Sequence, residues 1–177
     1  MRNSSKMKIA ILGFSGSGKS TLASFLSKRY QLPLLHLDRV QFERDWKERD
    51  SDEGRAIVQE FLDTHDSWVI DGNYSKFYKE RRLEEADEIV LLLFNRFSSL
   101  QRALKRYIKN RGNTRADIAD GCNEKIDLEF ILWILKNGRT KDKREGYENI
   151  LKKYPEKTVV LKNQKELNSY YKKNQRS

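Results

Sequence analysis

The segment Gly13-Phe14-Ser15-Gly16-Ser17-Gly18-Lys19-Ser20 decides the fold of this chain. Its spacing, a glycine, four free positions and then Gly-Lys-Ser, is that of a phosphate-binding loop. The apolar run 9–12 precedes the loop and the amphipathic stretch 20–30 follows it, so the loop connects a strand to a helix. Glycines let backbone N–H groups turn inward, and the helix start adds positive potential. The segment predicts binding of a nucleoside triphosphate.

The residue types inside the loop predict individual roles. Lys19 can reach the terminal phosphates, and the hydroxyl of Ser20 is placed to ligate Mg²⁺. Thr21, one step further, fits packing or capping as well as a phosphate contact. The residues expected to bind ATP here are those of the loop, Gly13, Ser15, Gly16, Ser17, Gly18, Lys19 and Ser20, together with Thr21, which follows it.

Apolar segments alternate with amphipathic ones along the chain, as in a parallel sheet wrapped by helices. The run 89–94 is continuously apolar, which is typical of a strand buried on both faces. The expected strands are 8–12, 34–37, 67–71, 88–94 and 158–161. The expected helices are 20–30, 52–62, 98–110, 125–136, 143–153 and 165–171. The fold class is therefore α/β: a P-loop NTPase three-layer sandwich, with a five-stranded parallel sheet flanked by helices.

Two of the expected helices carry strong apolar patterns. Helix 98–110 places Leu100, Ala103, Leu104, Tyr107 and Ile108 at helical spacing, which predicts an inward face. Segment 125–136 is apolar nearly all round, so we expect this helix to be well buried.

Two carboxylates end expected strands, Asp38 after the second and Asp71 after the third. Parallel sheets bind ligands at the carboxyl ends of their strands. A carboxylate there can hold Mg²⁺ or accept a proton from an attacking hydroxyl. The alternative is an aspartate that caps the next helix or turn. Because both aspartates occur in a chain with a phosphate-binding loop, a role in metal binding or proton transfer is favoured over capping.

Arginines supply the next indication of phosphate chemistry. Arg102 and Arg106 lie four residues apart and share one helix face. Guanidinium groups suit phosphate oxygens, and phosphoryl transfer depends largely on positioning and charge neutralisation. The polar segment 111–121 follows and reads as a loop that could close over the site. A solvated basic helix face is the alternative interpretation.

Composition limits the partners and the compartment. The 177 residues fit one domain, and 36 Lys and Arg against 26 Asp and Glu give a net charge of +10. This charge favours nucleic acid or phosphorylated small molecules, although a phosphate-handling enzyme with a basic tail at 162–177 also explains it. The single cysteine, Cys122, excludes an internal disulfide, and no apolar stretch approaches the length of a membrane span. We expect a cytoplasmic protein without a membrane partner.

The order of these features resembles that of the nucleoside monophosphate kinase group. More specifically, four segments are similar to those of the bacterial topology modulation proteins (FlaR-like), which are related to adenylate kinases. They are His36-Leu-Asp-Arg-Val-Gln-Phe42, Trp46-Lys-Glu-Arg49, Trp68-Val-Ile-Asp-Gly-Asn-Tyr74 and Asp120-Gly-Cys122. The resemblance extends to about Leu161.

The resemblance implies roles for residues outside the loop. Asp71 falls where related kinases place a carboxylate near Mg²⁺. Arg102 and Arg106 fall beside adenine and phosphate. Arg139 and Arg144 follow a small lid at about 107–124, where relatives place further phosphate-binding arginines, although the local spacing here matches less closely. This chain carries Leu93 and Asn95 where relatives often have Asp and Pro, which bears on a second metal contact and on adenine packing.

The acceptor side is an expected insertion at about 38–66. Asp38, Arg49, Asp71 and Asn73 are the predicted acceptor-binding residues, and Asp38 with Arg49 suggests an acceptor that carries a hydroxyl and a negative group. The predicted catalytic residues are Lys19, Asp38 and Arg106. The implied function is ATP- and Mg²⁺-dependent phosphoryl transfer to a small molecule or nucleotide. The alternative is a nucleic-acid-associated ATPase or a regulator of DNA topology.

Overall fold

The structure is a computed structural model that describes residues 7–109 and 126–176. Five parallel strands form one sheet in the order β2-β3-β1-β4-β5. The strands are β1 (Lys8–Gly13), β2 (Leu34–His36), β3 (Trp68–Asp71), β4 (Glu88–Leu92) and β5 (Thr158–Leu161). Each lies within two residues of its expected bounds. The chain is an α/β protein of the P-loop NTPase sandwich class, as the sequence predicts.

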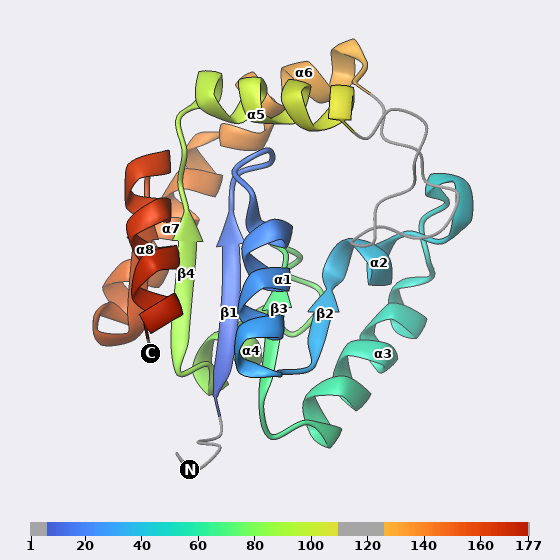
Figure 1. Cartoon of the computed structure of the whole chain (residues 1–177). Coiled ribbons are helices and arrows are strands. Elements are labelled where there is room, and N and C mark those ends of the chain that lie inside the picture. Colours follow the sequence, from blue (N-terminus) through green and yellow to red (C-terminus); the bar gives the residue numbers. More distant parts are fainter. Residues whose placement is uncertain (1–6, 110–125, 177) are drawn as a thin grey trace.

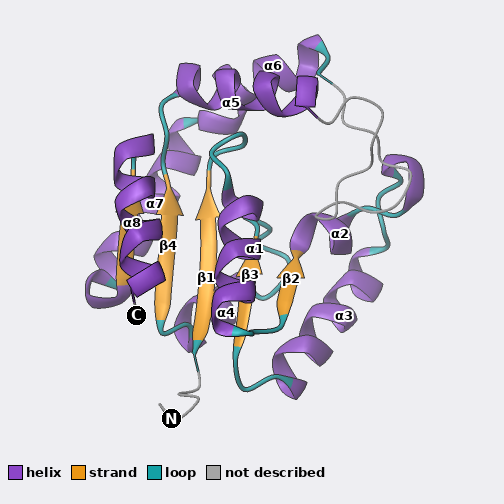
Figure 2. Cartoon of the chain, in the orientation of Figure 1, coloured by secondary structure: helices purple, strands orange, loops and turns teal. Residues whose placement is uncertain are grey.

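Helices surround the sheet on both faces (Figures 1 and 2). The α-helices are α1 (Lys19–Tyr30), α2 (Leu37–Gln41), α3 (Ser51–Thr64), α4 (Lys79–Glu85), α5 (Arg96–Lys109), α6 (Leu128–Leu135), α7 (Lys141–Lys153) and α8 (Gln164–Arg176). Three short 3₁₀ turns are η1 (Arg44–Trp46), η2 (Asn137–Arg139) and η3 (Pro155–Lys157). Within the described residues, no helix is long and apolar enough to cross a membrane.

The sheet separates the hydrophobic core into two layers, and the side chains of its central strand β1 point alternately into one and the other. Ile9 and Ile11 pack with α1 and α8 on one face of the sheet, whereas Ala10 and Leu12 pack with α3, α4 and α7 on the other. This alternation follows from the two-residue period of a strand. Leu167 and Tyr170 of α8 belong to the first layer, so most of the expected basic tail forms a packed helix.

The burial expected for α5 and α6 is wrong. Of the five apolar residues of 98–110, only Ala103 is buried, and Ile108 is 73% exposed. In α6 only Ile134 is buried, and Leu128 is 72% exposed. The reason is position: α5 and α6 contact each other beyond the carboxyl ends of the strands, where no sheet face covers them (Figure 1).

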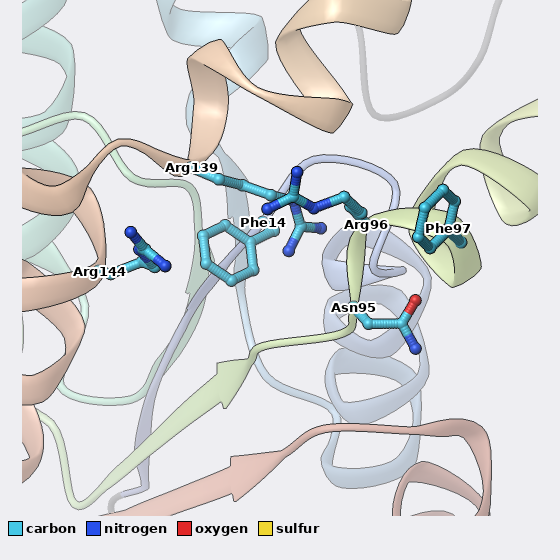
Figure 3. A pocket seen from close by; sticks show the side chains of 6 residues that line it. All are labelled: Phe14, Asn95, Arg96, Phe97, Arg139 and Arg144. Carbon is cyan, nitrogen blue, oxygen red and sulfur yellow. The ribbon is translucent and has the colours of Figure 1, made fainter.

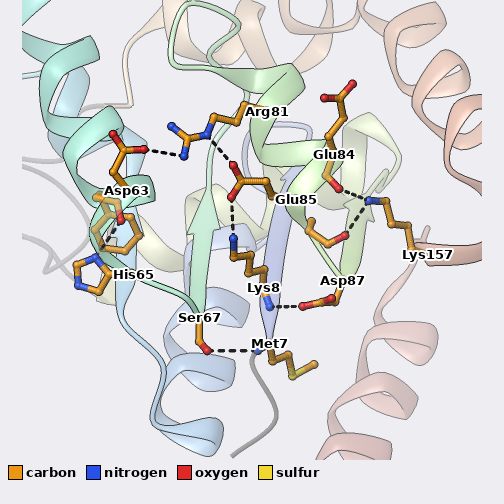
Figure 4. Close-up of polar contacts among 12 residues, drawn as sticks. Met7, Lys8, Asp63, His65, Ser67, Arg81, Glu84, Glu85, Asp87 and Lys157 are labelled. Carbon is orange, nitrogen blue, oxygen red and sulfur yellow. Dashed lines mark hydrogen bonds and ion pairs between the residues drawn. The ribbon is translucent and has the colours of Figure 1, made fainter.

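Polar contacts tie the opposite end of the sheet together (Figure 4). Lys8 binds Glu85 at 2.7 Å, and Arg81 bonds to Glu85 at 2.6 Å and to Asp63 at 2.7 Å. Lys157 donates to the backbone carbonyls of residues 84 and 86. These contacts link α3, α4, β1 and η3 at the edge that lies away from the phosphate-binding loop.

Candidate functional site

The phosphate-binding loop leaves β1 and turns into α1 at the carboxyl edge of the sheet (Figure 1). Gly16 and Gly18 have φ angles of 76° and 96°, in the left-handed region that favours glycine. A Cβ at Gly16 would lie 2.5 Å from the carbonyl oxygen of Ser99 at the start of α5. The loop therefore takes the inward-curled form that its glycines predict and is braced by α5.

The carbonyl of Phe14 organises the inside of the loop. It accepts hydrogen bonds from the Ser17 hydroxyl at 2.6 Å and from Nζ of Lys19 at 3.1 Å. Ser17 is fully buried by this arrangement. The Lys19 ammonium thus lies inside the curl of the loop, close to where phosphate oxygens bind in loops of this kind.

A chain of hydrogen-bonded polar groups lies where the loop enters α1, and it consists of Ser20, Asp71 and His36. The hydroxyl of Ser20 donates to Oδ2 of Asp71 at 2.9 Å. Nδ1 of His36 pairs with Oδ1 of the same carboxylate, and both side chains are buried. The strand register explains the second contact, because His36 of β2 lies beside Asp71 of β3. The structure therefore joins the two residues that the sequence assigns to Mg²⁺.

Asn73 clasps the end of β1. Its Oδ1 accepts from the backbone N–H of Gly13 at 3.0 Å, and its Nδ2 donates to the Gly13 carbonyl at 2.8 Å. The Tyr147 hydroxyl donates to the same Oδ1 at 3.2 Å. Both amide atoms of Asn73 are therefore used inside the protein, and its role in acceptor binding stays a prediction.

Asp38 lies in the first turn of α2, directly after β2, and accepts a hydrogen bond from the Tyr74 hydroxyl at 2.7 Å. Burial and the Asp38 charge raise the pKa of Tyr74, so this hydroxyl remains a donor. Arg82 is fully buried and donates to the carbonyls of Phe77 and Tyr74, which fixes the loop that carries Tyr74.

The predicted arginines have different surroundings. Arg102 lies against Gly18, stacks over Phe94 at 5.0 Å and bonds to Gln164 at the start of α8. Its Nε is buried without a partner within the described residues. Arg106 lies one turn further along α5, half-buried.

Arg139 and Arg49 use their guanidinium groups within the protein. Arg139 donates to the carbonyls of Ile134 and Phe94 and to the Ser99 hydroxyl, each at 2.8 Å. Arg49 donates to the Val40 carbonyl at 3.0 Å and pairs with glutamates at positions 43 and 53. The ligand-binding roles of both arginines stay predictions, and most of the expected lid, 110–124, lies outside the described residues.

A pocket of about 310 Å³ opens beside the loop, and we name it the arginine pocket (Figure 3). Its lining residues are Phe14, Asn95, Arg96, Phe97, Arg139 and Arg144. Three guanidinium groups and two phenyl rings thus surround one space.

The residues present fit ATP and Mg²⁺. The loop curls as the motif requires, and Ser20 and Asp71 offer two oxygen ligands at one point. Within residues 7–109 and 126–176, no group of three or more His, Cys, Asp or Glu could hold a metal ion. Magnesium usually needs only one or two carboxylates, with waters and substrate phosphates completing its six ligands.

Comparison with known proteins agrees with this class of fold. Residues 7–88 match the model of the isopentenyl transferase family, a stretch that contains the loop, Asp38 and Asp71. A crystal structure of an uncharacterised protein from Eubacterium ventriosum ATCC 27560 is 17% identical, with a TM-score of 0.52. That similarity covers 97% of this chain and 99% of the other. No curated protein matches significantly.

Sequence reasoning missed several residues of the site. His36 and Tyr74 belong to the segments quoted for the family resemblance, but no pattern along the chain pairs them with Asp71 and Asp38. The arginine pocket was not predicted as one space, because it joins the start of α5 to η2 and α7, more than 40 residues later, although the resemblance implies phosphate-binding roles for its Arg139 and Arg144. Of the three arginines that line the pocket, Arg96 at the first position of α5 is the one that was not predicted.

Proposed function

We propose that this protein is a phosphotransferase that moves the γ-phosphoryl group of ATP to a hydroxyl of a small-molecule or nucleotide acceptor. The hydrogen bond between Ser20 and Asp71 carries the proposal, because it brings a hydroxyl and a carboxylate to the point where a P-loop metal is held. Lys19 would pair with the terminal phosphates, and Arg102 and Arg106 would lie by the adenine and phosphates.

Asp38 would act on the acceptor. Its carboxylate lies at the carboxyl end of β2 and is held by the Tyr74 hydroxyl. It would take the proton of the acceptor hydroxyl while the acceptor oxygen bonds to the γ-phosphorus and the bond to ADP breaks. When bound, Mg²⁺ supplies charge neutralisation on the phosphate oxygens.

The test is acceptor-dependent release of ADP. Nucleosides, nucleoside monophosphates and hydroxy acids are offered with ATP and Mg²⁺, and at least one should raise ADP release. Lys19→Ala and Asp71→Asn should lower this rate by about 100-fold or more, the scale expected when transition-state charge loses its partner. Lys152→Ala, at an exposed position of α7, is the matched control. If no acceptor raises ADP release, the proposal fails.

The match to isopentenyl transferases supports a second candidate, transfer of an isopentenyl group. The diphosphate of a prenyl donor would occupy the same loop. Asp38 would take the proton of the acceptor while the acceptor atom bonds to the prenyl carbon, the carbon–oxygen bond of the donor breaks and diphosphate leaves. The two candidates separate by product mass. A reaction with ATP should yield a phosphorylated acceptor, and a reaction with dimethylallyl diphosphate should yield a prenylated acceptor. Only the correct donor should give a product, and the Lys19→Ala variant should fail to form it.

The resemblance to topology modulation proteins leaves nucleic-acid binding as a further alternative. The net charge of +10 is the observation that favours it. It stays a prediction, and its salt dependence is considered in the Discussion.

A further inference from the structure

Helix α5 carries a row of apolar side chains that point to solvent. Phe97 and Ile108 are each 73% exposed, and Leu104 is 39% exposed. Their spacing of seven and then four residues places the three side chains on one side of the helix, over about 16 Å of its length. We name this set, Phe97, Leu104 and Ile108, the α5 stripe.

The opposite side of α5 is the side that packs against the protein. Ser99 and Ala103, which lie almost half a turn away from the stripe, are fully buried. The backbone of Ser99 lies against Gly16 of the phosphate-binding loop. A surface helix normally turns its apolar side to the core. In α5 the stripe faces the other way, and three aligned apolar side chains indicate an interaction surface, whereas single exposed ones are ordinary.

The charge of α5 indicates what kind of surface the stripe fits. Five of the fourteen residues of this helix are Lys or Arg, and none is Asp or Glu. Arg96 precedes Phe97, and the exposed Lys105 follows Leu104, so cations flank the stripe. The whole chain carries a net charge of +10. An apolar stripe with cations beside it is complementary to a membrane surface with anionic headgroups.

Helix α5 also lies where a flat surface can reach it. In Figure 1 it runs along the end of the molecule beyond the carboxyl ends of the strands, away from both termini. Helix α6 shares this end, but the exposed Asp127 and Glu129 flank its exposed Leu128. Anionic headgroups would repel these carboxylates. The complementary surface is therefore the α5 stripe with its flanking cations, without the start of α6.

Other partners match this surface less well. A second copy of the chain in a two-fold contact would set the α5 stripe against itself. The cations of the two copies would then face each other, because α5 has no carboxylate to pair with them. A nucleic acid would match the cations, since it is bound mainly through its phosphates, but would leave the three apolar side chains without a partner.

We propose that α5 docks this protein on an anionic membrane surface, with Phe97, Leu104 and Ile108 inserted between the headgroups and Lys105 paired with lipid phosphates. The sequence argument against a membrane partner rests on the lack of a spanning segment, and a helix that lies along a membrane surface needs none. The docking surface does not depend on the proposed reaction.

Co-sedimentation with lipid vesicles at about 100 mM salt tests the proposal. The protein should bind vesicles of phosphatidylcholine with about one-third phosphatidylglycerol, and should bind phosphatidylcholine alone much less. Phe97→Ser/Ile108→Ser should weaken binding by about tenfold or more, because two apolar side chains lose their contact with lipid. Lys105→Gln should weaken binding less, and its effect should shrink as salt rises.

Leu151→Ser is the matched control. Leu151 is 41% exposed on α7 and precedes two lysines, so its loss removes a similar side chain from another basic helix and should leave binding unchanged. Thermal unfolding checks that each variant is folded, and Ile108→Gln replaces the double variant if that one is not.

Two results would overturn the proposal in the vesicle assay: no binding to the anionic vesicles, or equal binding by the protein and the stripe variant, which would leave only general attraction of charge. Sedimentation equilibrium supplies a third. A dimer that the stripe variant dissociates would show that a second copy covers the α5 stripe.

Discussion

His36 and Asp71 face each other from neighbouring strands, and Nδ1 of the imidazole is bonded to Oδ1 of the carboxylate. The other oxygen, Oδ2, accepts from Ser20 at 2.9 Å. One carboxylate thus links β2, β3 and the first turn of α1. Because both of its oxygens have a fixed partner, the orientation of Asp71 is set before any ligand arrives.

His36→Ala should weaken the use of Mg²⁺ more than the binding of nucleotide. The imidazole orients the Asp71 carboxylate, and loss of such a supporting group typically costs about 10- to 100-fold in metal affinity or activity. The Mg²⁺ dependence of ADP release should shift to higher concentrations, and excess Mg²⁺ should restore part of the rate. An unchanged Mg²⁺ dependence would contradict this role.

Asn73→Ala should loosen the phosphate-binding loop. Both amide atoms of Asn73 hold the backbone of Gly13, so their loss frees the end of β1. We expect the affinity for a non-hydrolysable ATP analogue, measured by calorimetry, to fall by about tenfold, the equivalent of one or two hydrogen bonds. Tyr147→Phe removes only the third contact to Asn73 and should have a smaller effect. An equal loss in both variants would count against the clasp.

Arg82→Met should destabilise the fold strongly, whereas Arg81→Met should not. Arg82 is fully buried and donates to backbone carbonyls, and burial lowers its pKa to about 10, so it stays charged at neutral pH. Each buried acceptor left without a partner costs about 1–3 kcal/mol, so we expect a loss of about 3 kcal/mol or more in urea unfolding. The partly exposed ion pairs of Arg81 should contribute about 1 kcal/mol or less.

Trp133 should report on occupancy of the phosphate-binding loop. Its indole N–H donates to the Ser15 hydroxyl at 3.1 Å, and the side chain is 43% exposed. A nucleotide in the loop changes this environment, so tryptophan fluorescence should change on adding an ATP analogue. Trp133→Phe should abolish the change and Trp46→Phe should keep it. A signal that survives in Trp133→Phe would place the responding indole elsewhere.

Binding to DNA should be weak and sensitive to salt. A net charge of +10 attracts any polyanion, but contacts of this kind fade steeply as salt rises. We expect fluorescence anisotropy with labelled duplex DNA to show binding at low salt and none by about 200 mM. Binding that persists at that salt and prefers one sequence would favour the nucleic-acid alternative.

The strands and the phosphate-binding loop were predictable because each depends on a pattern within a short segment. Strand β5 was placed without error at Thr158–Leu161. Helices α2 and α4 were missed, since α2 has five residues and α4 is mostly charged. The burial of α6 was wrong for a different reason: an apolar pattern shows which residues avoid water and says nothing of whether a sheet lies beneath them.

The residues of the candidate site were also predictable where they depend on one short segment, and not where they depend on how distant segments pack together. Lys19 and Ser20 follow from the spacing of one motif, and Asp38 and Asp71 follow from their places at strand ends. To predict the pairing of Asp71 with His36, one must know that β2 lies beside β3 in the sheet, and no single segment of the sequence gives the strand order. The arginine pocket could not be predicted from one segment, because its lining comes from the loop, the start of α5, η2 and α7, which lie together only in the folded chain.

The phosphate-binding motif at 13–20 accepts any residue at positions 14–17, yet the surroundings of these four side chains differ in the folded protein. The Phe14 ring fills a place in the core, Gly16 meets the Ser99 carbonyl, and Ser17 is enclosed by the loop. Only Ser15 points to a partner that is itself partly in solvent. A library randomised at these four codons and selected for folding would keep a large apolar residue, a glycine and a small residue at three of them, and would diversify at the fourth.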